Sequence, residues 1–379
     1  MAESQTSSHY DESAAYVALH YSYAAYCQPS DLQNWNCKFC NVASSDFEMQ
    51  HVISANYLQA FIGFDGKQSR IVISFRGTHN YEDWITDLEY KQIPYPNPTV
   101  ADAYVHEGFF NAYSEIRESG LLSSLQTLLS LHPNTHNLLI TGHSMGGALA
   151  ELCALDLVDN NIIADEMEID IYTFGGPRWA NKPLAQYFNA LSNIKQNWRI
   201  VNDNDPVPIV PGTFLGEYGF FHTTRQVLYT NYSSMQYVVC DASSGEDPSC
   251  AYDLWSHDAT AHLWYLNVHE NCNADEMNAE YDAYQAVPTV SETPVSSTEE
   301  QTNEDVKQHS NLTNFAVTQI SLLIMVVGCV LALVYHACIR KCQRMYGYDD
   351  IPEYVRRINL RSAGKKKPKK VMKAALLDA

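Results

Sequence analysis

The stretch ITGHSMGGALAEL, residues 140–152, constrains the fold of this chain more than any other. A small nucleophilic side chain, Ser144, stands between Gly142 and Gly146, after an apolar run and before an alanine-rich one. The first run predicts a strand, and the Ala, Leu and Cys spacing of the second predicts a helix. A serine between glycines on such a strand-to-helix turn is typical of a nucleophile elbow.

The rest of the body alternates in the same way between apolar strands and helices. Four near-continuous apolar runs predict buried strands, at residues 69–75, 136–142, 169–174 and 197–201. Strands that are apolar on both faces indicate a mainly parallel sheet with helices on both sides. We therefore expect residues 1–285 to form one α/β domain.

Composition divides the remaining residues into three segments. Residues 286–314 have no aromatic side chain and are rich in Ser, Thr, Glu and Pro, which predicts a flexible stalk. Residues 315–335 are 21 uncharged residues, and a helix of that length reaches about 32 Å, enough to cross a bilayer. We expect a transmembrane helix over 315–338, rather than a buried core helix, because no domain follows it. Residues 339–379 form the tail.

Charge predicts the topology. The tail from Arg340 onward holds 12 of the 24 basic side chains and 4 of the 44 acidic ones, so the body is strongly acidic. An acidic body excludes nucleic acid as a partner. The positive-inside rule puts the basic tail in the cytosol and the body in the lumen of a lysosome- or vacuole-type compartment or outside the cell.

Two features complicate that topology. The first 27 residues show neither a basic start nor the apolar run of a signal peptide. Either a leader is missing from this sequence or the span itself directs insertion. The alternative is a tail-anchored enzyme that faces the cytosol.

A serine nucleophile needs a general base, and the base needs a carboxylate to orient it. In this fold class the three follow one another as Ser, Asp or Glu, then His. Asp203 and Asp205 both follow the strand at 197–201, and we favour Asp205 because two prolines stiffen its loop. We favour His262 as the base, since the aromatic run around His222 is typical of a hydrogen-bonded core histidine.

Six short motifs occur over residues 16–272: SFRGT, VHEGFFNAY, GHSMGGALA, FGGPR, NDPVP and AHLWY. Together they resemble the class 3 lipase family. The resemblance implies an α/β-hydrolase fold, hydrolysis of lipid acyl esters, and a catalytic triad of Ser144, Asp205 and His262.

Two residues are expected to form the oxyanion hole. Met145 begins the elbow helix, so its N–H has no acceptor within the helix. The resemblance places Thr78, the last residue of SFRGT, at the second position. Arg76 of the same motif is expected to be an ion-paired strand end. No Walker-type loop, dinucleotide fingerprint or HExxH occurs, so we expect neither a cofactor nor a metal.

The segment YEDWITDLEY has helical periodicity. Its apolar side chains recur at positions i, i+3, i+4 and i+7, namely Tyr81, Trp84, Ile85 and Leu88. An ordinary surface helix shows the same pattern. Its place directly after Thr78, and the resemblance, instead predict a lid whose apolar face covers the site in water and turns toward lipid.

Cysteine usage predicts an oxidising compartment. Leaving out the span, the tail and the elbow helix, six cysteines remain, and they allow 15 pairings. The resemblance suggests Cys27 with Cys272 and Cys37 with Cys40; proximity suggests Cys240 with Cys250. A zinc or redox role for Cys37 and Cys40 is the alternative, but no second metal-like pair accompanies them. Two sequons, at Asn231 and Asn311, indicate the same compartment.

These observations predict a serine ester hydrolase that acts on a lipid interface, most consistently a lipase on acylglycerols. A phospholipase A1 or a feruloyl-type esterase would carry the same triad. A catalytically silent lipase-like binding module is the alternative from another class of function. In the tail, residues Tyr348 to Ile351 resemble the tyrosine-based signals that sorting adaptors bind.

Overall fold

The computed structural model describes part of the chain, namely residues 9–78, 90–96, 100–202, 204–213, 219–223, 225–231, 235–241, 245–250 and 259–272. All of these belong to the first of two units into which the chain divides, Met1–Thr289. The predicted stalk, span and tail lie outside the described residues, as does the predicted lid. Among the helices that are described, none has the length and apolar content needed to cross a bilayer.

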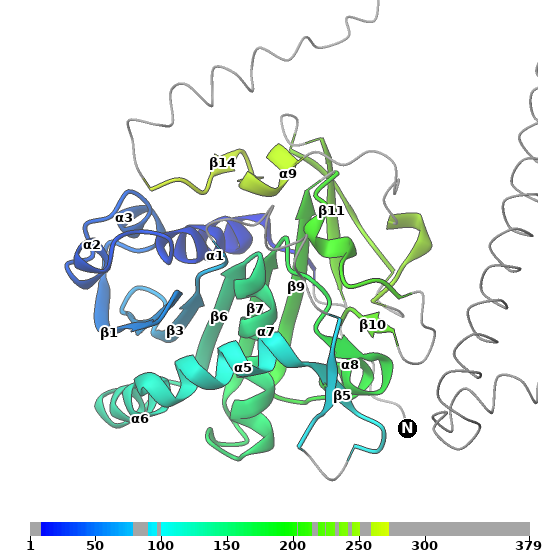
Figure 1. The fold of residues 1–379 in the computed structure, drawn as a ribbon. Coiled ribbons are helices and arrows are strands. Elements are labelled where there is room, and N and C mark those ends of the chain that lie inside the picture. Colours follow the sequence, from blue (N-terminus) through cyan, green and yellow to red (C-terminus); the bar gives the residue numbers. More distant parts are fainter. Residues whose placement is uncertain are drawn as a thin grey trace, which may run out of the picture. The chain divides into compact units, whose positions relative to one another are not determined.

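An eight-stranded sheet forms the centre of the fold, in the order β1-β2-β3-β6-β7-β9-β11-β12 (Figure 1). Its strands are β1 (Phe47–Ala55), β2 (Leu58–Asp65), β3 (Arg70–Phe75), β6 (Asn137–His143), β7 (Glu168–Phe174), β9 (Ile194–Asn202), β11 (Gln226–Asn231) and β12 (Gln236–Val239). The strands from β3 to β11 run parallel, and β1, β2 and β12 add antiparallel edges. The four predicted strands are β3, β6, β7 and β9, so the α/β prediction is confirmed.

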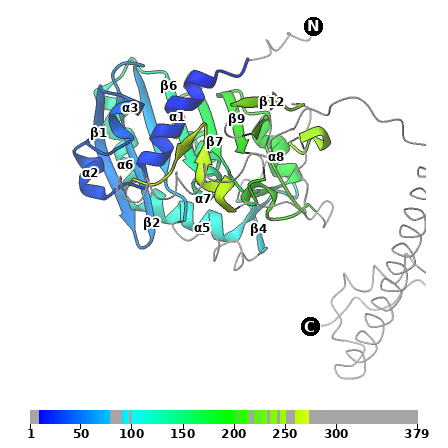
Figure 2. The ribbon, with the colours of Figure 1, turned by 90° about the horizontal axis from the view of Figure 1, so that it is seen from above.

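Helices cover both faces of this sheet, on opposite sides in Figure 2. One face packs against α5 (Glu107–Ile116), α6 (Leu122–Leu131), α7 (Met145–Asp159) and α8 (Lys182–Asn189). The other packs against α1 (Glu12–Ala24), α2 (Pro29–Gln33) and α3 (Cys40–Ala43). Leu138 and Ile140 of β6 point to the first face and Leu139 points to the second, because successive side chains of a strand alternate between faces.

Two helices are buried along most of their length, which explains why their sequences lack a polar stripe. Helix α1 begins at Asp11, whose carboxylate accepts the N–H groups of Ser13 and Ala14 at 2.9 and 3.2 Å, as an N-cap residue does. Helix α7 is buried along most of its length and holds the buried free thiol of Cys153. It starts at the carboxyl end of β6, directly after Ser144.

Shorter elements complete the described part of the chain. A second sheet has the order β10-β8-β5-β4, and a third pairs β13 with β14. Their bounds are β4 (Gln92–Pro94), β5 (Tyr104–His106), β8 (Ala180–Asn181), β10 (Phe220–Phe221), β13 (Trp264–Tyr265) and β14 (Val268–His269). The remaining short helices are η1 (Arg117–Leu121), η2 (Val207–Ile209), η4 (Pro248–Cys250) and α9 (Ala259–Leu263).

Three disulfides link the six cysteines as predicted: Cys27–Cys272, Cys37–Cys40 and Cys240–Cys250. The first joins residues 245 apart in sequence, so it ties the segment after α1 to the segment after β14. A native disulfide that closes a long loop stabilises a domain by about 2–4 kcal/mol.

Candidate active site

The strand-to-helix turn at Ser144 has the strained backbone of a nucleophile elbow. Ser144 has φ 59° and ψ −132°, in the left-handed region that an L residue rarely adopts. A Cβ atom on Gly142 would lie 2.2 Å from the carbonyl oxygen of Gly146, and one on Gly146 would lie 2.2 Å from that of Phe75. Both glycines are therefore required by close backbone approach, as the sequence predicts.

A buried imidazole and carboxylate lie beside this turn. Nδ1 of His262 is 2.8 Å from Oδ2 and 3.0 Å from Oδ1 of Asp205, and both side chains are almost fully buried. Asp205 Oδ1 also accepts the N–H of Val207 at 2.8 Å, and Oδ2 accepts the hydroxyl of Tyr265. The carboxylate thus holds the proton of His262 on Nδ1 and leaves Nε2 to act as a base.

Three further residues, which were not predicted as part of the site, hold this pair in place. Asn202, at the end of β9, donates its amide to the carbonyls of Ala261 and Trp264 at 3.0 and 2.6 Å. Gly175 has φ +58°, and a Cβ atom there would lie 2.7 Å from Asp205 Oδ2. With Tyr265, these residues fix the helix α9 that carries His262. Gly175 lies in the motif FGGPR and Tyr265 lies in AHLWY. These motifs contain both residues, but they do not indicate that the residues position His262 and Asp205.

The two expected oxyanion residues meet next to Ser144. Thr78 follows β3, and its hydroxyl donates to Sδ of Met145 at 3.7 Å. Met145 is the first residue of α7, where backbone N–H groups have no intrahelical acceptor. A Cβ atom on the neighbouring Gly77 would lie 2.7 Å from Cβ of Ser144, so this loop packs directly on the elbow.

The hydroxyl of Ser144 is buried and makes no hydrogen bond to any described residue. The hydrogen bond of a closed serine–histidine pair is therefore not formed in this state. Catalytic hydrogen bonds of this kind are often long without substrate and tighten when substrate binds. The arrangement offers a hydroxyl nucleophile, an oriented base and helix-terminal N–H groups within one buried site.

The two candidate histidines, His222 and His262, have different hydrogen-bond partners in the structure. Nε2 of His222 lies 2.7 Å from the carbonyl oxygen of Pro208, and the ring is buried. Burial, followed by the charges of Arg199 and Arg178, holds the pKa of His222 well below its usual value. His222 is thus a neutral core histidine, as predicted, while Asp205 pairs with His262. Asp203 lies outside the described residues.

One expectation near this site is wrong. Arg76 forms no ion pair within the described part of the chain; its guanidinium donates to the carbonyl of Tyr57, and its backbone N–H donates to that of Gln59 at 3.0 Å. The backbone oxygen of Tyr57, between β1 and β2, takes the place of the expected carboxylate. Burial lowers the pKa of Arg76.

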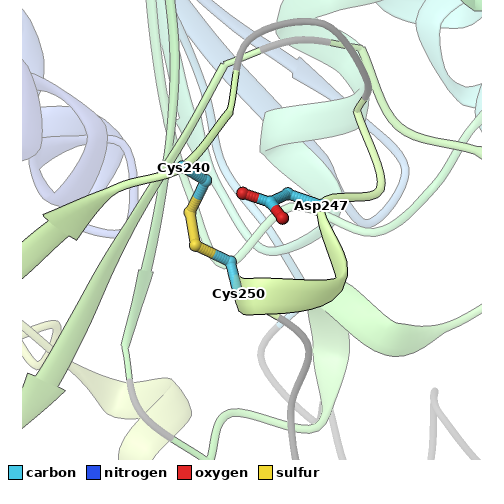
Figure 3. A group of neighbouring side chains, drawn as sticks. All are labelled: Cys240, Asp247 and Cys250. Atoms are coloured by element: carbon cyan, nitrogen blue, oxygen red, sulfur yellow. A yellow bond between two sulfur atoms is a disulfide. The ribbon is translucent and has the colours of Figure 1, made fainter.

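A cluster of Cys240, Asp247 and Cys250 has the residue types of a metal site (Figure 3). The two sulfurs are bonded to each other, and a metal binds the thiolate form of cysteine. Asp247 Oδ2 accepts the backbone N–H of Asp241 at 2.7 Å. In this oxidised form the cluster stabilises the segment after β12 and offers a metal one carboxylate only.

Other predicted positions lie outside the described residues: Tyr81, Trp84, Ile85 and Leu88 of the lid, the Asn311 sequon, the span and the sorting motif. Asn231 is the last residue of β11, where the chain leaves the sheet toward β12.

Comparisons with known proteins match the body of the chain. Residues 72–215 match the family model described as lipase (class 3). A lipase from Rhizomucor miehei is 29% identical over 237 residues, which cover 62% of this chain and 62% of the relative. A secreted mono- and diacylglycerol lipase A from Penicillium cyclopium is 28% identical over 214 residues, covering 54% of this chain and 65% of the relative. The chain thus spans less than two thirds of the length of these curated relatives.

A solved structure agrees with the fold. It is that of a triacylglycerol lipase whose catalytic centre is a serine protease triad, and it matches with a TM-score of 0.61 and 28% identity over 68% of this chain and 95% of its own. Fold and site together define an α/β-hydrolase that carries a serine elbow and a buried His–Asp pair. The body of the chain is similar to the class 3 lipase family, whose model matches residues 72–215.

Proposed function

We propose that this protein is a serine ester hydrolase that cleaves acyl esters of acylglycerols. The observation that carries the proposal is the buried hydrogen-bonded pair of His262 and Asp205 beside the strained elbow at Ser144. A lipase-like binding module has no need of an oriented base next to an elbow serine.

The geometry supports the following reaction. Oγ of Ser144 attacks the ester carbonyl carbon and passes its proton to Nε2 of His262, while Asp205 stabilises the imidazolium. The N–H groups of Met145 and Thr78 hydrogen-bond to the oxyanion. The ester C–O bond then breaks, and the leaving alcohol takes the proton from His262. Water repeats the sequence on the acyl-enzyme and releases the carboxylic acid.

Acylglycerols are the substrate class that the relatives support, since one is named a mono- and diacylglycerol lipase and another, in its solved structure, a triacylglycerol lipase. Phospholipase A1 and feruloyl-type esterase activities use the same catalytic groups. A panel of tri-, di- and monoacylglycerols, phospholipids and feruloyl esters, assayed with wild type and Ser144→Ala, separates them. Faster turnover of a phospholipid or feruloyl ester than of every acylglycerol would contradict the proposed substrate.

Access to this site requires a movement. Ser144, Asp205 and His262 are each at most 1% exposed, so a lipid ester cannot reach the hydroxyl in this state. We assign the movement to the segment from Tyr81 to Leu88, a lid whose apolar side chains meet the lipid surface. Its position in sequence directly after Thr78 supports this role.

The remaining segments are proposed to anchor the enzyme. Residues 1–285 form the lipase domain, 286–314 the stalk, 315–338 a single transmembrane helix and 339–379 a cytosolic tail with a sorting signal at Tyr348 to Ile351. Three disulfides in the body support a luminal or extracellular domain, and so do relatives named as secreted lipases. Asn231 and Asn311 would then be glycosylated.

The simplest test of the activity uses a fluorophosphonate probe, which reacts with an activated serine. Wild type should be labelled at Ser144, and Ser144→Ala should not be labelled. Absence of labelling in folded wild type, opened with detergent or lipid, would instead support the binding module.

A further inference from the structure

His143, the residue before the nucleophile, connects several parts of the site. Its ring is 0% exposed, and both ring nitrogens have partners. Nε2 lies 2.8 Å from the main-chain oxygen of His262. Nδ1 lies 2.8 Å from the hydroxyl of Tyr26 and 3.2 Å from Oε2 of Glu270. The reaction described above does not use this side chain.

The partners of His143 come from loops that are far apart in the sequence. Tyr26 follows α1, and its hydroxyl accepts the backbone N–H of Gly77 at 3.2 Å, next to the oxyanion residue Thr78. Glu270 follows β14, and His262 lies in α9. One imidazole therefore links the oxyanion loop, the nucleophile elbow and the segment that carries the base.

The hydrogen-bond roles in this network are set by the acceptors. A carbonyl oxygen only accepts, so Nε2 of His143 carries a hydrogen and donates it to His262. Burial and then the charge of Glu270 hold the pKa of Tyr26 well above its usual value. The phenol keeps its proton at neutral pH and remains both a donor and an acceptor.

Covalent and packing contacts hold the same segments together. The Cys27–Cys272 disulfide joins the residue after Tyr26 to the segment two residues beyond Glu270. The amide of Gln59 donates to the carbonyls of Ala25 and Cys27, each at 2.8 Å. The rings of His143 and His262 lie 4.5 Å apart with an interplanar angle of 31°. His143 is thus held on one side and in contact with the base on the other.

We propose that His143 is a positioning residue for the ester hydrolysis proposed above, on which this inference rests. Through Nε2 it sets the place of the His262 backbone relative to Ser144, and through Tyr26 it sets the place of the oxyanion loop. A misplacement of about 1 Å between reacting groups costs about 100-fold in rate. The interaction acts on the chemical step and leaves substrate binding unchanged.

The first test compares three variants on a soluble short-chain ester. His143→Leu removes both polar atoms and should lower kcat by about 10- to 100-fold with KM unchanged. His143→Gln places an N–H near the position of Nε2 and should restore part of that loss. His20→Leu is the matched control: His20 is also buried and lies 2.8 Å from a carbonyl oxygen, that of Tyr16, but in α1. It should lower the melting temperature and leave kcat unchanged.

The second test is a double-mutant cycle. If Tyr26 and His143 act as one unit, adding Tyr26→Phe to His143→Leu should cost little beyond His143→Leu alone. The rate of phosphonate labelling of Ser144 should fall in parallel with kcat.

Three outcomes would overturn the proposal: wild-type kcat in folded His143→Leu, equal kcat for the Gln and Leu variants, or independent losses for His143 and Tyr26. These outcomes can be distinguished from failure of the proposed function. If that function is wrong, the wild-type protein is not labelled by the fluorophosphonate probe and hydrolyses no ester.

Discussion

At the scale of single residues, the hydroxyl of Ser144 is buried without a hydrogen-bond partner among the described residues. Ser144→Ala therefore leaves no donor or acceptor unpaired, and we expect the melting temperature to stay within a few degrees of wild type. Turnover should fall by about 10⁴-fold or more, because no other group supplies the nucleophile. Assays on a soluble ester check the loss of turnover, and thermal unfolding checks the melting temperature. A stable variant with retained turnover would exclude Ser144 as the nucleophile.

The two candidate histidines give opposite expectations. His262→Ala removes the base and Asp205→Asn removes the charge that orients it, so each should lower kcat by about 10⁴-fold. His222→Ala leaves the carbonyl of Pro208 buried and unpaired, which costs about 1–3 kcal/mol of stability. Its kcat below the melting temperature should stay near wild type. The base assignment is wrong if stable His222→Ala loses activity and His262→Ala keeps it.

His222 also predicts how stability depends on pH. Its pKa is well below the usual value in the folded state because of burial, so the unfolded chain binds a proton that the folded chain does not. Its contribution opposes folding as pH falls below the unfolded pKa of about 6.5. The drop in the urea midpoint between pH 7 and pH 5 should therefore be smaller for His222→Gln than for wild type. An equal drop in both proteins would show that His222 titrates normally.

Local sequence singles out the proposed reacting groups but not the residues that support them. Ser144, Asp205 and His262 lie in short motifs whose composition indicates their chemistry. Asn202 contacts Ala261 across 59 residues, and Tyr265 contacts Asp205 across 60. No local pattern reveals contacts over such separations, so the roles of Asn202 and Tyr265 become visible only once the chain is folded.

At the scale of elements, the proposed lid is the segment with the most direct test. Trp84→Ala removes the largest apolar side chain from the predicted helix at residues 81–88. Activity on an emulsified long-chain acylglycerol should fall several-fold more than activity on a soluble short-chain ester, since only the emulsion requires an apolar face to meet an interface. Asp83→Ala, on the polar side of the same helix, is the control. Equal losses of Trp84→Ala on both substrates would indicate a packing role.

The strands that the sequence predicted are those with a nearly continuous apolar run. The strands β3, β6, β7 and β9 are almost continuously buried, and their apolar runs are unmistakable. Strand β1 has mixed burial, because it lies at an edge of the sheet, and it shows no clean alternation. Helix α1 is buried on most sides and rich in tyrosine, so it lacks the polar face by which a helix is usually detected.

At the scale of the whole molecule, one measurement tests the proposed membrane topology, in which the body is luminal or extracellular. If the body is luminal, an endoglycosidase should shift the expressed protein downward on a gel, and Asn231→Gln with Asn311→Gln should abolish that shift. The six cysteines of the three disulfides should resist alkylation until they are reduced. Absence of a shift, together with alkylation of all six in cells lysed under alkylating conditions, would contradict the luminal model.

The Cys27–Cys272 disulfide has a mechanical consequence. Tension applied to the chain beyond residue 272 passes through the disulfide to Cys27 and the end of α1. The cross-link carries load in parallel with the segment from Ala259 to Asn271, which holds His262 and Glu270, so this segment bears less of the force. An enzyme pulled through this end should keep hydrolysing its substrate under strain as long as the cross-link is intact, and should lose activity under the same pull once it is reduced.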